Sequence, residues 1–149
     1  MDLQEQYSRL LRYCFMKTKD RFIAEDIVQE TFLRFWQSHS YRDTGKETAY
    51  LYTIARNLCI DEFRKPAYVS IEECAEPVAD SRYEPEKNLL QDSVREAMDK
   101  LPDDLREIIT LRYVSELSAA EIGKIIGMSR FGVHRRIKEG LELLKKELT

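Results

Sequence analysis

Apolar residues recur at intervals of three and four along the first 66 residues, which is the spacing of one face of an α-helix. Three such stripes follow one another: Leu3, Tyr7, Leu10, Leu11 and Cys14; then Ile23, Ile27, Thr31 and Phe35, with Val28 and Phe32 beside them; then Leu51, Ile54, Ala55 and Leu58. A turn signal at residues 42–45 separates the second stripe from the third, and Pro66 should end the third helix. The pattern predicts three helices that bury a shared core within residues 1–66.

A second helical unit is predicted over residues 86–149. Its first helix carries Leu90, Val94, Ala97 and Leu101, and its second begins at Pro102 and carries Leu105, Ile108, Ile109 and Arg112. Ser118 and Glu121 have the spacing of a capping box, so a short helix should start there and end at Gly127, a residue suited to a left-handed C-cap. Ser129 caps a last helix that should run to about residue 148.

Residues 67–85 interrupt the helical pattern. They contain prolines and acidic residues but few large apolar side chains, which is typical of an extended, flexible linker. The chain is therefore predicted to be all-α, with two small helical units joined by an acidic linker.

Composition excludes several classes of protein. Of the 149 residues, 43% are hydrophobic and 34% are charged, which suits a helical protein with a core and a solvated surface. No apolar run approaches the roughly 18 residues that cross a bilayer and no leader pattern is present, so we expect a cytoplasmic protein without membrane insertion. Cys14, Cys59 and Cys74 lack the spacing of a zinc site, so we expect no metal or cofactor, and buried thiols at Cys14 and Cys59.

The net charge of −3 hides a local concentration of basic residues. Between Ser129 and Lys138 there are four basic residues and no acidic one. Together with the capped helix before it, this segment has the pattern of a helix-turn-helix, whose second helix fits the DNA major groove. The side chains predicted to face outward there are Arg130, Phe131, His134, Arg135 and Lys138. Arginine can bond guanine and phenylalanine can contact a thymine methyl group, so this surface could read DNA bases. The alternative interpretation is a helical hairpin whose charged side chains are only solvated.

Two further helix faces are candidate binding surfaces. Asp26, Gln29 and Glu30 share one face at i, i+3 and i+4, and could form a protein-docking face with Leu33 or a merely solvated one. On the third helix, Tyr50, Tyr52, Arg56, Asn57, Arg64 and Lys65 interleave aromatic, amide and basic groups. Such groups can stack unpaired bases and bind a nucleic-acid backbone, although the tyrosines could equally be core edges.

Several sequence blocks resemble those of bacterial sigma factors, in particular the short extracytoplasmic-function (ECF) group of the sigma-70 family. Ala24-Glu-Asp-Ile-Val-Gln-Glu-Thr-Phe and Leu51-Tyr-Thr-Ile-Ala-Arg-Asn-Leu-Cys-Ile-Asp resemble region two, and Leu101-Pro with Leu117-Ser-Ala-Ala-Glu-Ile-Gly123 resembles region four. The resemblance covers about 85% of the chain and omits only the linker. It implies region two at residues 1–66 as a three-helix bundle, a linker at 67–85 and region four at 86–149. Glu47, Tyr50 and the Ser129-Arg-Phe-Gly-Val133 block depart from the usual family pattern, so the promoter sequence is not predicted.

The resemblance also implies roles for individual residues. Asp26, Gln29 and Glu30, with Leu33, would dock on the β′ clamp helices of core RNA polymerase. Recognition and melting of the −10 element would involve Tyr41, Arg42, Thr44, Lys46, Thr48, Tyr50, Arg56, Asn57 and Arg64. Recognition of the −35 element would involve Ser118, Ser129, Arg130, Phe131, His134, Arg135 and Lys138. The second unit would also contact the β flap, and an anti-sigma factor would hold the protein inactive.

Two other hypotheses remain open at this stage. A free-standing helix-turn-helix regulator that binds an operator as a dimer explains residues 118–138 but gives the first 66 residues no role. A small helical enzyme would need an acid/base or metal cluster, and the sequence shows none. We therefore expect a promoter-specificity subunit without enzymatic activity.

Overall fold

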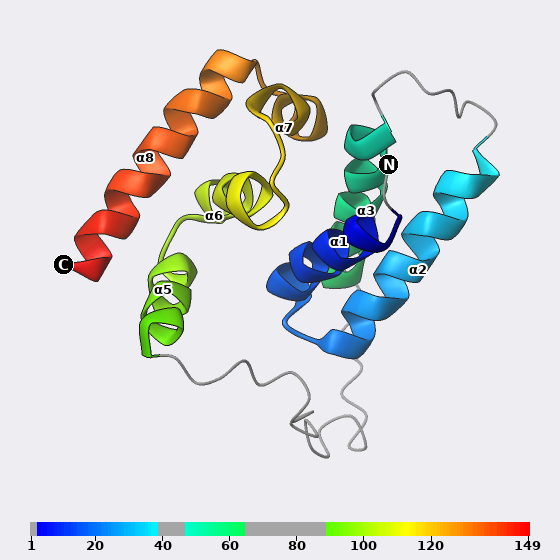
Figure 1. The fold of residues 1–149 in the computed structure, drawn as a ribbon, viewed down its shortest axis with the longest axis horizontal. Helices are drawn as coiled ribbons and strands as arrows, with labels where there is room; N and C mark the ends of the chain where they lie inside the picture. The colour runs from blue at the N-terminus through cyan, green and yellow to red at the C-terminus, as the bar shows by residue number, and fades with distance from the viewer. Residues whose placement is uncertain (1–2, 39–46, 65–88) are drawn as a thin grey trace.

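The computed structural model describes residues 3–38, 47–64 and 89–149, and in the helix that begins at residue 89 it describes side chains from residue 92 onward. Every element in these ranges is helical, which confirms the predicted all-α class (Figure 1). The predicted linker, 67–85, lies outside the described residues. None of the described helices is long and apolar enough to cross a membrane.

The first unit consists of α1 (Leu3–Thr18), α2 (Arg21–Gln37) and α3 (Glu47–Arg64). Asp20 caps α2, because its side chain accepts the backbone N–H groups of Phe22 and Ile23. The predicted stripes supply much of the core, in which these side chains are fully or almost fully buried: Leu10, Cys14, Val28, Thr31, Phe35, Leu51 and Ala55. Cys59, outside the predicted stripes, is buried with them. Leu3 and Tyr7, at the start of the first predicted stripe, are instead exposed. The three predicted helices are confirmed.

The second unit consists of α5 (Leu89–Asp99), α6 (Asp103–Ile109), α7 (Ala119–Ile126) and α8 (Arg130–Leu148). Pro102 directly precedes α6 instead of lying in its first turn. The prediction of one regular α-helix through Arg112 is wrong, because the chain continues from α6 as a π-helical segment, η2 (Thr110–Val114). A π-helix takes an extra residue per turn and redirects the side chains that follow it.

The α7–α8 turn has the geometry that the sequence predicts. Ser118 and Glu121 form a capping box at the start of α7, and Ser129 caps α8 by accepting the Gly132 N–H at 3.1 Å. Gly127 ends α7 with a φ of +75°, in the left-handed region that favours glycine. A Cβ at Gly123 would lie less than 3.0 Å from the Met128 carbonyl oxygen and overlap it. The absence of a side chain at Gly123 therefore allows the backbone of the turn at Met128 to pack directly on α7.

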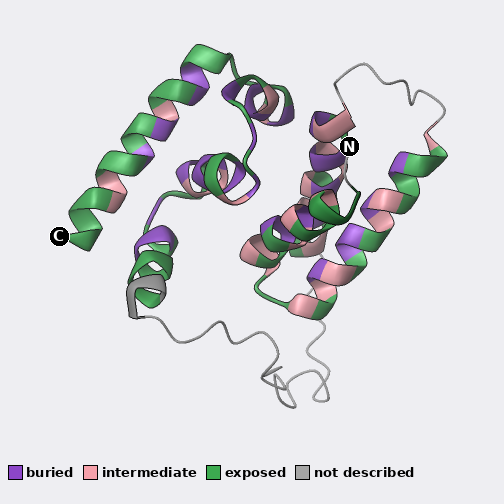
Figure 2. Cartoon of the chain, viewed as in Figure 1, coloured by how far each residue is buried: buried purple, intermediate pink, exposed green. Residues whose placement is uncertain are grey.

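The two units pack against each other, which the sequence pattern did not predict. α7 contacts α3, and η2 contacts α1 (Figure 1). Buried residues of both units form one continuous hydrophobic core, and the outer faces of α2, α5 and α8 are exposed (Figure 2). The functional surfaces therefore lie on a single body with two halves.

Candidate nucleic-acid and docking surfaces

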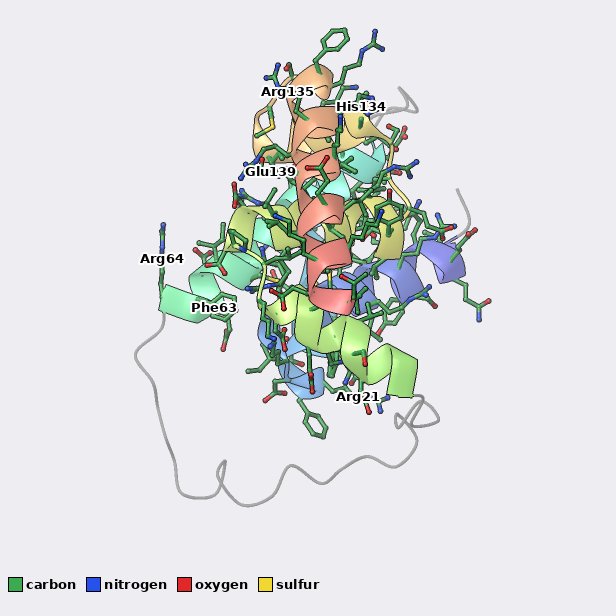
Figure 3. The ribbon with its side chains drawn as sticks, turned by 90° about the vertical axis from the view of Figure 1, so that its left-hand side faces the viewer. Arg21, Phe63, Arg64, His134, Arg135 and Glu139 are labelled. Carbon is green, nitrogen blue, oxygen red and sulfur yellow. The ribbon has the colours of Figure 1, made fainter. Side chains whose placement is uncertain are left out.

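The first turns of α8 present an exposed surface rich in basic and aromatic groups. Phe131 is 67% exposed, and Arg130, His134, Arg135 and Lys138 are exposed as well. The Arg130 guanidinium lies 5.3 Å from the centre of the Phe131 ring, a cation–π contact. His134 and Arg135 project from the same end of the helix (Figure 3). The surface joins a flat aromatic ring to several cationic donors, the combination that contacts base edges and phosphates.

Packing fixes the orientation of this surface. Val133 and Ile137 are buried on the opposite side of α8. Arg136, the remaining basic residue of the segment, pairs with Asp104 and lies 2.7 Å from the Glu139 carboxylate. Arg136 thus ties α8 to the start of α6 and differs in environment from the basic side chains beside it.

Ser118 and Ser129 lie at the two helix N-termini of the motif, and both hydroxyls are engaged in capping. The Ser118 hydroxyl accepts the Glu121 N–H at 3.1 Å, and the Glu121 carboxylate accepts the Ser118 N–H at 3.0 Å. Both serines are exposed. They satisfy backbone N–H groups at the N-termini of α7 and α8 and fix where each helix begins.

A groove of about 420 Å³ lies between α2 and α3. Its lining is Ile23, Asp26, Ile27, Glu30, Arg34, Leu58, Asp61 and Glu62. Asp26 and Gln29 are exposed, Leu33 is 52% exposed, and Glu30 forms an ion pair with Arg34 at 2.8 Å. The predicted α2 face is therefore accessible, and its residues Asp26 and Glu30 belong to one wall of an apolar-floored groove with an acidic rim.

Sequence reasoning missed the α3 wall of this groove. Asp61 and Glu62 follow Leu58 at i+3 and i+4, so they share one face of α3 with it. That spacing was the only sequence signal that could have pointed to an acidic and apolar face on α3. It became informative only once the pairing of α2 with α3 was known.

The other predicted residues of α3 lie in contrasting environments. Tyr50 is 42% exposed and packs at 5.8 Å against the Phe35 ring, whereas Tyr52 is fully buried and belongs to the core. Asn57 and Arg64 are exposed, and Arg64 projects from the end of α3 (Figure 3). Burial raises the pKa of the Tyr52 hydroxyl to about 12. Tyr52 therefore offers no surface to a ligand in this arrangement.

Arg56 meets an acidic residue of the second unit. Its Nε donates to Glu107 Oε1 at 2.9 Å, while the Tyr13 hydroxyl donates to Glu107 Oε2 at 2.9 Å and Lys17 pairs with the same oxygen. Burial alone would raise the pKa of Glu107, but Lys17 and Arg56 outweigh it, so the pKa lies below its usual range. Glu107 was not among the predicted site residues.

Some predicted residues cannot be placed on these surfaces. Tyr41, Arg42, Thr44 and Lys46 lie outside the described residues, and Thr48 is half-buried, with its hydroxyl 3.5 Å from the Gln6 amide nitrogen. Within the described ranges no group of three His, Cys, Asp or Glu side chains could hold a metal ion. Cys14 and Cys59 are buried free thiols, as predicted.

Comparison with known proteins finds a family model that matches each half of the chain. The model of Sigma-70 region 2 matches residues 3–67, and that of Sigma-70, region 4 matches residues 97–146. The chain is 34% identical to the ECF RNA polymerase sigma factor SigW of Bacillus subtilis, over 94% of this chain and 83% of that protein. It is 33% identical to SigM of the same organism, over 79% and 75% of the two chains.

The fold also matches a solved structure. The sigma factor RpoE of Bartonella quintana, crystallised in complex with the anti-sigma factor NepR, superposes with a TM-score of 0.73. The sequence identity is 22%, and the superposition covers 99% of this chain and 94% of that one. Because it covers nearly the whole of both chains, the likeness of fold includes both helical units.

Proposed function

The chain belongs to the sigma-70 family as an ECF RNA polymerase sigma factor, and from this premise we propose how its surfaces serve promoter-specific transcription initiation. Sigma factors are initiation factors and not enzymes. The free-standing regulator hypothesis is not favoured, because residues 3–67 match a sigma region of their own. Each surface described above therefore needs a role within an initiation complex.

The groove between α2 and α3 is the proposed docking site for the β′ clamp helices of core polymerase. Asp26 and Glu30 would supply one wall, and Asp61 would add charge on the other. Gln29 and Leu33, which are exposed on the same helix outside the groove lining, would extend the docking face. An apolar floor with an acidic rim suits an amphipathic helix that carries basic residues. Exposure of Asp26 and Leu33 supports the assignment, because a docking face must be accessible before polymerase binds.

The exposed turns of α8 are the proposed reader of the −35 element. Arg130 and Arg135 can bond guanine bidentately, Phe131 can contact a thymine methyl group, and Lys138 can neutralise a phosphate. His134 would lie beside them in the groove, with Ser118 and Ser129 at the helix ends that meet the DNA backbone. The observation that carries the proposal is this exposed basic and aromatic surface, on a helix packed against α7, in a chain that contains both sigma regions.

The first unit would recognise and melt the −10 element. The 41–48 segment would capture a flipped base, and Tyr50, Arg56, Asn57 and Arg64 would guide the melted strand along α3. Residues 1–66 and 86–149 thus act on separate promoter elements, joined by residues 67–85. The second unit would also bind the β flap. A role with polymerase and DNA supports a cytoplasmic location, where an anti-sigma factor would be a further partner.

Run-off transcription from a pool of randomised promoters tests the proposed function. Bacterial core polymerase is assayed with and without the full chain, and protein-dependent transcripts are sequenced. We expect enriched templates to share two elements about two helical turns apart, roughly 70 Å of B-DNA. Failure of the chain to bind core polymerase would overturn the proposal, and a palindromic footprint without polymerase would support the free-standing regulator instead.

A further inference from the structure

Two cysteine side chains from distant parts of the sequence meet in the core of the first unit. Cys14 on α1 and Cys59 on α3 are both 0% exposed, and both belong to the hydrophobic core. The two thiols are hydrogen-bonded to each other, which brings their sulfur atoms side by side. Two free thiols in contact are the arrangement from which a disulfide forms.

The packing of α1 against α3 holds this pair in place (Figure 1). Near the start of both helices, the Gln6 amide nitrogen lies 3.5 Å from the Thr48 hydroxyl. Further along both, the Tyr13 and Tyr52 rings meet edge to face with their centroids 5.4 Å apart. The two helices therefore run in the same direction and stay in contact over several turns. Because cysteine is small, it lets the helix backbones approach, and a disulfide needs Cα atoms about 4.4–6.8 Å apart.

The two thiols differ in how readily they lose a proton. The hydrogen bond from Cys14 lowers the pKa of the Cys59 thiol against the opposing effect of burial, and the Lys17 ammonium acts in the same direction. The same hydrogen bond, together with burial, raises the pKa of Cys14. The thiolate is the nucleophilic form of cysteine. Cys59 is therefore the reactive member of the pair, and Cys14 is the partner that keeps its proton.

Burial determines which oxidant reaches the pair. Neither cysteine is exposed, so a bulky reagent such as glutathione disulfide has no approach in the folded chain. Hydrogen peroxide is uncharged and little larger than water, and it can enter through small local openings of the fold. A role in packing alone would require neither the contact between the thiols nor a cation beside them.

We propose that Cys14 and Cys59 form a disulfide site that hydrogen peroxide oxidises and that cross-links α1 to α3 reversibly. The Cys59 thiolate attacks one peroxide oxygen, the O–O bond breaks, and the departing hydroxide takes up a proton and leaves as water. The Cys14 sulfur then attacks the sulfur of the Cys59 sulfenic acid, the S–O bond breaks, and a second water carries away the Cys14 proton. Two electrons pass from the sulfurs to the peroxide, so two thiols and one peroxide become one disulfide and two waters. A dithiol reverses the step by exchange.

The cross-link would close a loop that contains the whole of α2. A disulfide stabilises a protein mainly by restricting its unfolded chain, and the effect grows with the length of the closed loop. For a loop of roughly 45 residues in a chain of this size, the expected rise in melting temperature is about 10 °C. The inference goes beyond the proposed function and does not rest on it, because it concerns the covalent state of the core of the first unit.

The experiment counts free thiols in the full chain after treatment with hydrogen peroxide. The folded protein is oxidised, then unfolded in guanidinium with iodoacetamide and weighed by intact mass spectrometry. The reduced chain takes up three labels, because it has three cysteines. We expect the oxidised chain to take up one label, on Cys74, and to take up three again after dithiothreitol. Peptide mapping should identify the cross-link as Cys14–Cys59.

Three variants test the two roles. Cys74→Ala is the matched control, because it removes a cysteine and keeps the pair: its label count should fall from two to zero, and its melting temperature should rise by about 10 °C. This result needs no change in the core. In Cys14→Ala the Cys59 sulfenic acid has no thiol to attack it, so dimedone should trap it there. Cys59→Ala should give no dimedone adduct on Cys14, with circular dichroism to check that both variants fold.

Several outcomes would contradict the inference. Three labels on the peroxide-treated wild-type chain would overturn it, as would a disulfide that includes Cys74. A dimedone adduct on Cys14 in Cys59→Ala, with none on Cys59 in Cys14→Ala, would overturn the assignment of Cys59 as the reactive thiol. Absence of promoter-dependent transcription by the reduced chain would overturn the proposed function and not the disulfide site.

Discussion

Gly123 provides a quantitative test of how the helix-turn-helix is built. In an ordinary helix, Gly→Ala stabilises by about 1 kcal/mol, because alanine restricts the unfolded chain and shields the backbone. At Gly123 the added Cβ would overlap the backbone carbonyl oxygen of Met128. Backbone atoms cannot rotate aside as a flexible side chain does, so the substitution forces the turn itself to move.

The expected cost follows from two contributions. Overpacking of this kind costs about 1–3 kcal/mol. The Gly123 carbonyl also accepts the N–H groups of Gly127 and Met128, at 2.8 and 2.9 Å, and a displaced turn weakens both bonds, by about 1 kcal/mol each. After subtraction of the helix-propensity gain, we expect Gly123→Ala to destabilise by about 3 kcal/mol, or roughly 1.5 M in the urea midpoint.

Gly127→Ala is the matched control because the same methyl group is added four residues away. Nothing lies within 4 Å of a Cβ there, so the cost comes from the φ of +75° alone, about 1 kcal/mol. In urea denaturation followed by circular dichroism, we expect the midpoint to be highest for wild type, lower for Gly127→Ala and lowest for Gly123→Ala. A midpoint for Gly123→Ala at or above that of wild type would refute the argument, since it would mean that the turn accommodates a side chain freely.

Three further predictions concern function and pH. Charge reversal at Asp26 and Glu30 should abolish binding to core polymerase in a pull-down without lowering the melting temperature; unchanged affinity would remove the docking assignment. Arg135→Ala should weaken promoter-dependent transcription by about 1–3 kcal/mol and relax the selected sequence upstream, and an unchanged selected sequence would show that Arg135 does not read bases. Because the folded pKa of Glu107 is depressed, its contribution to the stability of the folded chain is full above the ordinary value of about 4.5 and is lost as pH falls through the lowered pKa. The difference in melting temperature between wild type and Glu107→Gln should therefore shrink on acidification, and a constant difference from pH 7 to pH 3 would contradict this.

Local chemistry made much of the fold predictable from sequence. Ser118, Gly127 and Ser129 occupy the cap positions predicted for them, because capping depends on residues within one turn of each other. The π-helical segment at Thr110–Val114 was not predicted, because apolar spacing alone does not reveal one inserted residue. The exposed face of α8 was also predictable from local sequence, because buried and exposed positions follow the 3.6-residue period of a single helix.

The interface between the units could not be predicted in this way. In the sequence, Glu107 resembles any acidic residue in a helix, and its partners Tyr13 and Arg56 are 94 and 51 positions away. Tyr52 was open to two interpretations, and only the packing of the helices resolved it as core. Contacts of this range depend on how whole elements dock, information that no local pattern contains.

The shared core of the two units has a consequence for how the protein unfolds. Buried residues of both units form one continuous hydrophobic core, so one unit cannot unfold without exposing apolar surface of the other. The described helices should therefore unfold in one cooperative transition, as a single small domain does. A probe in α1 and a probe in α8 should report the same urea midpoint.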